Sequence, residues 1–151
     1  MTTHAEKRHL PYTPEQLFDI VADVKKYPEF LPWCISSRIT KDDGDIFYAD
    51  LIIGYKMVRE KYGSKVSLKS PEHIHVEYLS GPMKYLSNHW HFIRENDGSC
   101  TIDFFVDFEF KNRLLQNLIG VFFNEVVQRM VGAFEARAKE LYGASGLNQQ
   151  S

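Results

Sequence analysis

The change from strand to helix patterning after residue 110 constrains this fold more than any other feature of the sequence. Between residues 100 and 110 apolar and polar side chains alternate, and one side of the alternation is wholly apolar: Ile102, Phe104, Val106, Phe108 and Phe110. A period of two indicates a strand with one buried face. From residue 112 to 142 apolar residues recur at helical spacing, and Gly143 provides a stop. The sequence therefore predicts a strand followed directly by a long C-terminal helix.

The predicted C-terminal helix has a wide apolar surface. Its main apolar residues cluster when plotted at a helical period: Leu115, Leu118, Ile119, Phe122, Phe123, Val126, Val127, Met130, Phe134 and Leu141. Together with further apolar neighbours they cover more than half of the circumference, which is wider than one sheet face requires. A helix of roughly 30 residues is about 45 Å long. Such a helix can cross an entire sheet.

The segment from residue 35 to 110 consists of short alternating runs separated by turn sequences. The runs predict strands over 36–40, 46–53, 55–67, 73–80, 86–95 and 100–110. Their spacing is typical of an antiparallel meander. Before them, Thr13, Pro14 and Gln16 form a capping pattern for a brief helix, and Pro28 and Pro32 bracket a turn or short helix. The fold class is therefore α+β.

Length and composition fit one domain over residues 1–143, followed by a small, polar and flexible tail over 144–151. The net charge of −2 gives no general positive field, so we expect no DNA partner. Cys34 and Cys100 lack the spacing of metal-binding cysteines and indicate two separate thiols in a reducing compartment. A disulfide between them is the alternative.

The first ten residues lack the apolar core of a secretory signal and the pattern of a transit peptide, and no run of eighteen apolar residues occurs. We therefore expect a cytoplasmic protein that contacts a membrane, if at all, only peripherally.

Four segments resemble the coenzyme-Q-binding START family, within the larger polyketide cyclase and lipid-transfer group: VADVKKYPEFLPWC at 21–34, HWHF at 89–92, GSCTIDFFVDFEFKNRLL at 98–115 and FNEVVQRMVGAFEARA at 123–138. The resemblance implies a START-like ligand-binding domain with a helix-grip fold, in which two short helices follow the first strand. In this fold a curved antiparallel sheet wraps around the C-terminal helix and leaves a lipid-sized cavity. It also implies ubiquinone binding in support of respiratory electron transfer. Some bacterial members are described as ribosome-association toxins that bind the large ribosomal subunit. The mitochondrial members carry a targeting sequence, a pattern that the first ten residues lack. A bacterial cytoplasmic protein that is at most peripheral to the inner membrane is therefore the simpler interpretation.

The candidate ligand-binding residues combine the apolar faces of the sheet and the helix: Trp33, Asn88, Trp90, Phe104, Phe108, Leu118, Phe122, Val126 and Met130. An apolar wall suits an isoprenoid tail, and Asn88 would donate to a quinone carbonyl if it shares the inward face with Trp90. The alternative is that these side chains fill an ordinary packed core. The apolar pattern favours the register in which Trp90 and Phe92 point inward; a slip of one residue would instead turn His89 and His91 inward.

A second candidate site is the proline-bounded segment with Tyr27, Phe30, Leu31 and Trp33. Its large apolar groups suit either the mouth of a pocket with membrane contact, aided by Lys25 and Lys26, or a plug at one end of the core.

Two HxH pairs, His73 with His75 and His89 with His91, fall on neighbouring predicted strands. An even register would gather all four imidazoles, which suits zinc, but we expect solvated strand histidines on the outer face and no metal. Asp103, Asp107 and Glu109 should also be solvated, on the face opposite the apolar one.

The sequence contains no nucleophile-elbow, zinc-protease, P-loop or dinucleotide motif, so we expect a non-enzyme without a required cofactor. The leading hypothesis is a protein that binds ubiquinone or a similar polyprenyl lipid and supports respiration or quinone biosynthesis. The alternative is a partner of the large ribosomal subunit that contacts phosphates through Lys56, Arg59, Lys61 and Lys65. An enzyme on the same fold is a third class, because fold does not fix function.

Overall fold

The computed structural model describes residues 2–55 and 57–147. In chain order the elements are β1 (Thr2–Leu10), α1 (Pro14–Ala22), the 3-10 helix η1 (Val24–Glu29), β2 (Cys34–Asp42), β3 (Ile46–Tyr55), β4 (Val58–Lys69), β5 (His73–Ser80), β6 (Met83–Arg94), β7 (Cys100–Phe110) and α2 (Arg113–Tyr142). The predicted α+β class, with two short helices after the first strand, is confirmed.

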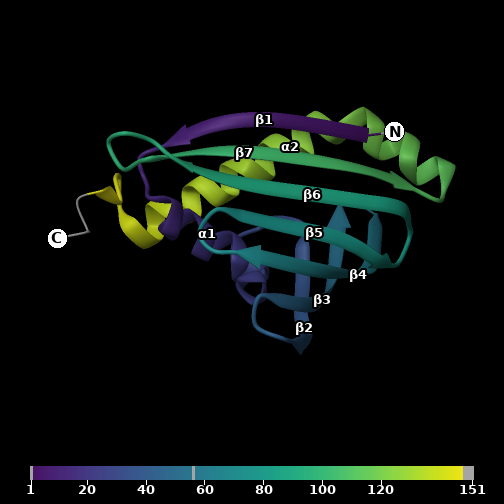
Figure 1. Cartoon of the computed structure of the whole chain (residues 1–151). Coiled ribbons are helices and arrows are strands. Elements are labelled where there is room, and N and C mark those ends of the chain that lie inside the picture. Colours follow the sequence, from purple (N-terminus) through teal and green to yellow (C-terminus); the bar gives the residue numbers. More distant parts are fainter. Residues whose placement is uncertain (1, 56, 148–151) are drawn as a thin grey trace.

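The seven strands form one antiparallel sheet in the order β1-β7-β6-β5-β4-β3-β2. Strands β2 to β7 are a meander, and β1 closes the other edge by pairing with β7. Figure 1 shows the sheet curving strongly, with β2 and β3 running at a steep angle to β7 and with α2 lying along the sheet. This is the helix-grip architecture, in which the inner face of the sheet surrounds one long helix.

The short helix α1 begins where the capping pattern predicts. The Thr13 side chain accepts a hydrogen bond from the backbone N–H of Gln16, and the Gln16 side chain accepts one from the backbone N–H of Thr13. These reciprocal bonds satisfy two N–H groups that a helix start leaves unpaired. In Figure 1 α1 lies beside the C-terminal end of α2, where the Tyr12 hydroxyl donates to the carbonyl of Gly143 over 2.6 Å.

The core lies between the inner face of the sheet and α2. Along β7 the predicted face is confirmed, since Ile102, Phe104, Val106 and Phe110 are buried and Phe108 is half-buried. Trp90 and Phe92 lie on the same side, and Trp90 pairs directly with Phe104. The tryptophan register is therefore the correct one, and the HxH pairs face outward.

Several predicted strand boundaries differ from the observed ones by one to three residues, and the prediction places Tyr55 in the wrong strand. The sequence predicts Tyr55 at the start of the fourth strand, but Tyr55 ends β3 and pairs with Val58. In the sequence Gly54 indicates the end of a strand, but in the structure it pairs with Arg59 and β3 continues through it. A glycine inside a strand keeps its backbone hydrogen bonds, so its presence alone does not end the pairing.

The hairpin between β5 and β6 turns at Gly81. Its φ of +133° is strained for any residue with a side chain, and a Cβ there would lie 2.8 Å from the carbonyl oxygen of Lys61. The close approach of β4 therefore requires glycine at this turn.

Cys34 and Cys100 are both buried free thiols, as expected. Residues 148–151 of the predicted tail lie outside the described residues. Before them, the Gly146 N–H donates to the carbonyl of Pro11 over 2.9 Å.

Candidate functional site: an apolar cavity between sheet and helix

A cavity of about 240 Å³ lies between the inner face of the sheet and α2. Its wall is formed by strands β3 to β7, by α2 and by the segment from α1 to the start of β2, and it is mostly aliphatic and aromatic. An engineered cavity of about 150 Å³ is large enough to hold benzene. The space in this protein therefore exceeds what a single unsubstituted ring needs.

Seven of the nine predicted ligand-binding residues line this cavity: Trp33, Asn88, Trp90, Phe104, Phe108, Val126 and Met130. Leu118 and Phe122 do not line it, and their placement in the wall is wrong. Ile119 and Phe123, one position further along α2, take their place. Successive residues of a helix point about 100° apart. Because the apolar surface of α2 is wide, rotation of the helix about its axis changes which of its apolar residues face the cavity.

Trp90 is the centre of an aromatic cluster in the wall. Its ring lies 4.7 Å from that of Phe104 and 5.0 Å from that of Phe134, both at steep angles. The Trp90 Nε1–H donates to Asn88 Oδ1 over 2.8 Å. Asn88 Nδ2 in turn donates to the carbonyl of Phe105 over 2.8 Å. Asn88 therefore shares the inward face with Trp90 and orients its indole ring. Because one amide hydrogen of Asn88 is used by the Phe105 carbonyl, the other is left for a ligand.

A polar group that the sequence analysis missed is the hydroxyl of Tyr62 on β4. Tyr62 lines the cavity, and among the described residues its hydroxyl has no hydrogen-bond partner. Burial, with a smaller contribution from Cys34, raises the pKa of Tyr62 above its usual range. The group is therefore a neutral O–H donor at physiological pH. Strand β4 carries Tyr62, Ser64 and Val66 inward, and this mixed polarity hid its inner face from a search for apolar alternation.

Burial acts in the same way on neighbouring groups. It raises the pKa of the Cys34 thiol to about 11 and that of Tyr27 above its usual range. Both side chains line the cavity. Cys34 is therefore a protonated thiol near neutral pH, which does not suit a nucleophile.

The predicted mouth residues pack against α2. Tyr27 and Leu31 line the cavity, and the Tyr27 hydroxyl donates to the carbonyl of Val21. The Phe30 ring lies 5.2 Å from that of Phe134, and the Arg137 guanidinium lies 5.1 Å from the Phe30 ring centre. Tyr27 and Leu31 therefore close part of the cavity wall, and Phe30 packs on α2 beside them. Contact of this segment with a membrane stays a prediction.

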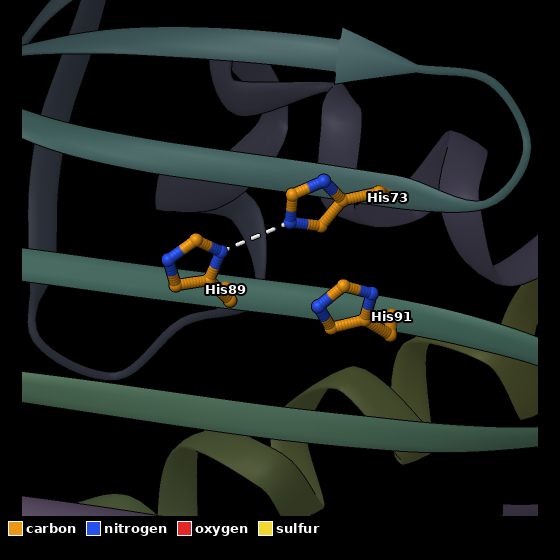
Figure 2. Close-up of side chains that lie close together, drawn as sticks. All are labelled: His73, His89 and His91. Atoms are coloured by element: carbon orange, nitrogen blue, oxygen red, sulfur yellow. Dashed lines mark hydrogen bonds between the residues drawn. The ribbon is translucent and has the colours of Figure 1, made fainter.

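The outer face of the sheet carries the polar groups that the alternation assigned to it. Asp107 accepts a hydrogen bond from the Thr3 hydroxyl over 2.9 Å, and Glu109 lies 3.3 Å from the Lys84 amine. Pairing of β5 with β6 places His73 opposite His91 and His75 opposite His89. Figure 2 shows His73, His89 and His91 pointing from these strands toward one another.

Comparison with known proteins agrees with this architecture. A family model described as polyketide cyclase / dehydrase and lipid transport matches residues 10–135. The chain belongs to this family. The matched residues cover strands β2 to β7, the two short helices and most of α2, and therefore every element of the cavity wall.

Two curated relatives in this family differ in the role that their names give. The ribosome association toxin RatA of Rickettsia prowazekii is 37% identical over 145 residues, which cover 93% of this chain and 99% of the relative. The mitochondrial coenzyme Q-binding protein COQ10 homolog B of Xenopus laevis is 38% identical over 144 residues, which cover 93% of this chain and 59% of that protein.

Solved structures of similar proteins share the fold. An 18 kDa protein from Caulobacter crescentus is 35% identical and superposes with a TM-score of 0.77 over 95% of this chain and all of that one. An aromatase/cyclase from Streptomyces sp. R1128 superposes with a TM-score of 0.81 over 91% of this chain and 93% of its own, at 12% identity. The second likeness concerns the fold alone. Within the described residues, no helix is long and apolar enough to span a bilayer.

Proposed function

We propose that this protein binds ubiquinone, or a similar polyprenyl lipid, in the cavity between the sheet and α2. The observation that carries the proposal is an apolar cavity of about 240 Å³ with a neutral phenol donor, Tyr62, in its wall. A quinone ring offers carbonyl acceptors, and its isoprenoid chain needs only apolar walls. The relative named as a coenzyme Q-binding protein supports the same ligand class.

The proposed role is non-catalytic. Redox chemistry belongs to the quinone, while the protein shields and presents it in support of respiration or quinone biosynthesis. We place the protein in a bacterial cytoplasm, where transient contact of the Tyr27, Phe30 and Leu31 segment with the inner membrane would allow lipid exchange.

Direct identification of a bound lipid tests the proposal. Protein purified without detergent from its native host should release a quinone or polyprenyl lipid into an organic extract, in near-stoichiometric amount by mass spectrometry. An empty extract, together with no binding of added ubiquinone to the purified protein, would rule this function out.

Substitution of Tyr62 by phenylalanine tests the head-group contact. A hydrogen bond contributes about 0.5–1.5 kcal/mol, so Tyr62→Phe should weaken ubiquinone binding by about 2- to 12-fold in a fluorescence titration. Tyr48→Phe makes the same change on the outer face of β3 and should leave the affinity unchanged. Equal affinity of Tyr62→Phe and the unmodified protein would remove Tyr62 from the site.

We infer a second candidate function, association with the large ribosomal subunit, from the basic outer face of β4. Arg59 and Lys61 are exposed there and Lys65 is half-buried, while Lys56 lies outside the described residues. The Lys61 amine lies 3.7 Å from Asp50, which leaves Arg59 and Lys65 as the more available phosphate ligands. The relative named as a ribosome association toxin favours this partner.

Charge reversal distinguishes this second function. If it operates, the double variant Arg59→Glu/Lys65→Glu should lose co-sedimentation with large subunits at moderate salt, because phosphate contacts depend on positive charge. The control Lys7→Glu/Lys111→Glu makes the same charge change at exposed positions on β1 and after β7. Retained co-sedimentation in the first variant, or no co-sedimentation of the unmodified protein, would exclude this interface.

A further inference from the structure

The outer face of the sheet carries a cluster of four histidines that the lipid-binding cavity does not use. Strands β5 and β6 pair with His73 opposite His91 and His75 opposite His89. The residues between them point inward, since Ile74 and Trp90 are 1% and 4% exposed. Side chains directly opposite on antiparallel strands have Cβ atoms only about 4.5–5.5 Å apart. The register therefore gathers the imidazoles on the side of the sheet away from α2.

The rings lie parallel and close. His73 stacks on His91 at a centroid distance of 4.2 Å and an angle of 6°, and His75 stacks on His89 at 4.0 Å and 10°. His73 Nε2 lies 3.0 Å from His89 Nδ1, which Figure 2 marks with a dashed line. One nitrogen from each of His73, His89 and His91 lies within 4.8 Å of the others.

These nitrogen separations are close to those of a metal centre. Nitrogens bound to zinc at about 2.0–2.1 Å in tetrahedral geometry are about 3.3 Å apart. The His73 to His89 separation is already slightly shorter, and rotation of the exposed His91 ring brings the third nitrogen inward. The three rings stand on two strands that are already paired.

The cluster has a fourth member beside these three rings. Both ring nitrogens of the fourth histidine, His75, have other partners: Nδ1 lies 3.3 Å from Glu77 and Nε2 lies 3.5 Å from the Ser87 hydroxyl. It packs against His89 and restricts that ring. Such neighbours hold ligating imidazoles in orientation.

We propose that His73, His89 and His91 form a binding site for a divalent transition metal ion, with Zn²⁺ as the best match to three imidazoles. A fourth position would remain for water. The ion would join β5 to β6 on the outer face, opposite Trp90, and would add its binding free energy to the stability of this strand pair. The site is separate from the lipid cavity and does not depend on the proposed function.

Calorimetric titration with ZnCl₂ tests the proposal. The protein should be free of a histidine tag, treated with chelator and dialysed at pH 7.5. We expect one Zn²⁺ per chain with a dissociation constant in the micromolar range or below, and tetrahedral d–d absorption bands when Co²⁺ replaces Zn²⁺. Loss of a partner that only orients a ligand weakens metal affinity by about 10- to 100-fold, so His89→Gln should weaken it by at least that much.

Two control variants make the result specific. His9→Gln changes an exposed histidine on β1, beyond β7, and should leave Zn²⁺ affinity unchanged. The cavity variant Val126→Trp should also bind Zn²⁺ normally, since it alters only the opposite face. Circular dichroism must show that His89→Gln is folded; His91→Gln, at an exposed position, provides a second test if it is not. No binding of Zn²⁺ at millimolar concentration, or equal affinity in the folded ligand variants, would overturn the proposal.

Discussion

Replacement of Val126 by tryptophan should reduce the quinone that co-purifies with the protein by at least about tenfold, which corresponds to about 1.4 kcal/mol of binding free energy. Val126 lies on α2 and lines the cavity, but it is only half-buried. An indole there can occupy the cavity from its helical wall without a clash against the fully packed core. The indole then takes up room that the ligand would fill, so the ligand loses contacts with the cavity wall. The packing contacts within the protein are kept.

The matched control is Val121→Trp, which makes the same change on the same helix where the side chain is 77% exposed. Quinone in organic extracts, expressed per mole of protein and quantified by mass spectrometry, is the measurement. Urea unfolding should show that both variants are at least as stable as the unmodified protein. Undiminished quinone in a folded Val126→Trp variant would mean that the lipid binds outside the cavity.

Replacement of Trp90 by alanine should lower the free energy of unfolding by about 3–5 kcal/mol, the range observed for truncation of large buried aromatic side chains. Trp90 is 4% exposed and packs against Phe104 and Phe134. Truncation also removes the N–H that donates to Asn88 Oδ1. The loss therefore combines a larger cavity with a polar atom that has lost its donor.

Urea denaturation with an unchanged m-value measures this effect. Trp90→Phe keeps most of the apolar volume, so it should lower the free energy of unfolding by less than Trp90→Ala does. Its remaining effect should come mainly from the loss of the indole N–H. Trp33→Ala truncates a half-buried tryptophan in the same cavity wall and should also cost less. If Trp90→Ala cost under about 1 kcal/mol, the aromatic cluster would not be a packed part of the core.

The inner face of the sheet followed from the sequence because strand periodicity leaves only two choices. In β7 five alternate apolar residues identify the inner face. The register of the hairpin then assigns Trp90 in β6 to the same face. A strand residue points to one face or the other, so a correct register assigns every side chain at once. The same argument placed the HxH pairs on the outer face.

The helical wall was less predictable, because a helix presents a continuous range of directions. Val126 and Met130 were placed correctly, whereas Leu118 and Phe122 were exchanged for Ile119 and Phe123. The apolar surface of α2 covers more than half of its circumference, so the sequence left its rotation open. Packing against the curved sheet selected the part that faces the cavity.

By itself, the sequence determined the order of the elements from α1 onward, the inward face of β6 and β7, the cap of α1 and the long final helix, because local periodicity and capping chemistry encode each of these. Only the tertiary structure decided the rotation of α2, the exposure of the Tyr62 hydroxyl to the cavity and the meeting of His73 with His89 and His91. Each of these depends on how one element sits against another. That placement is set by the combined packing of many side chains and by hairpin register, which no single segment of the chain specifies.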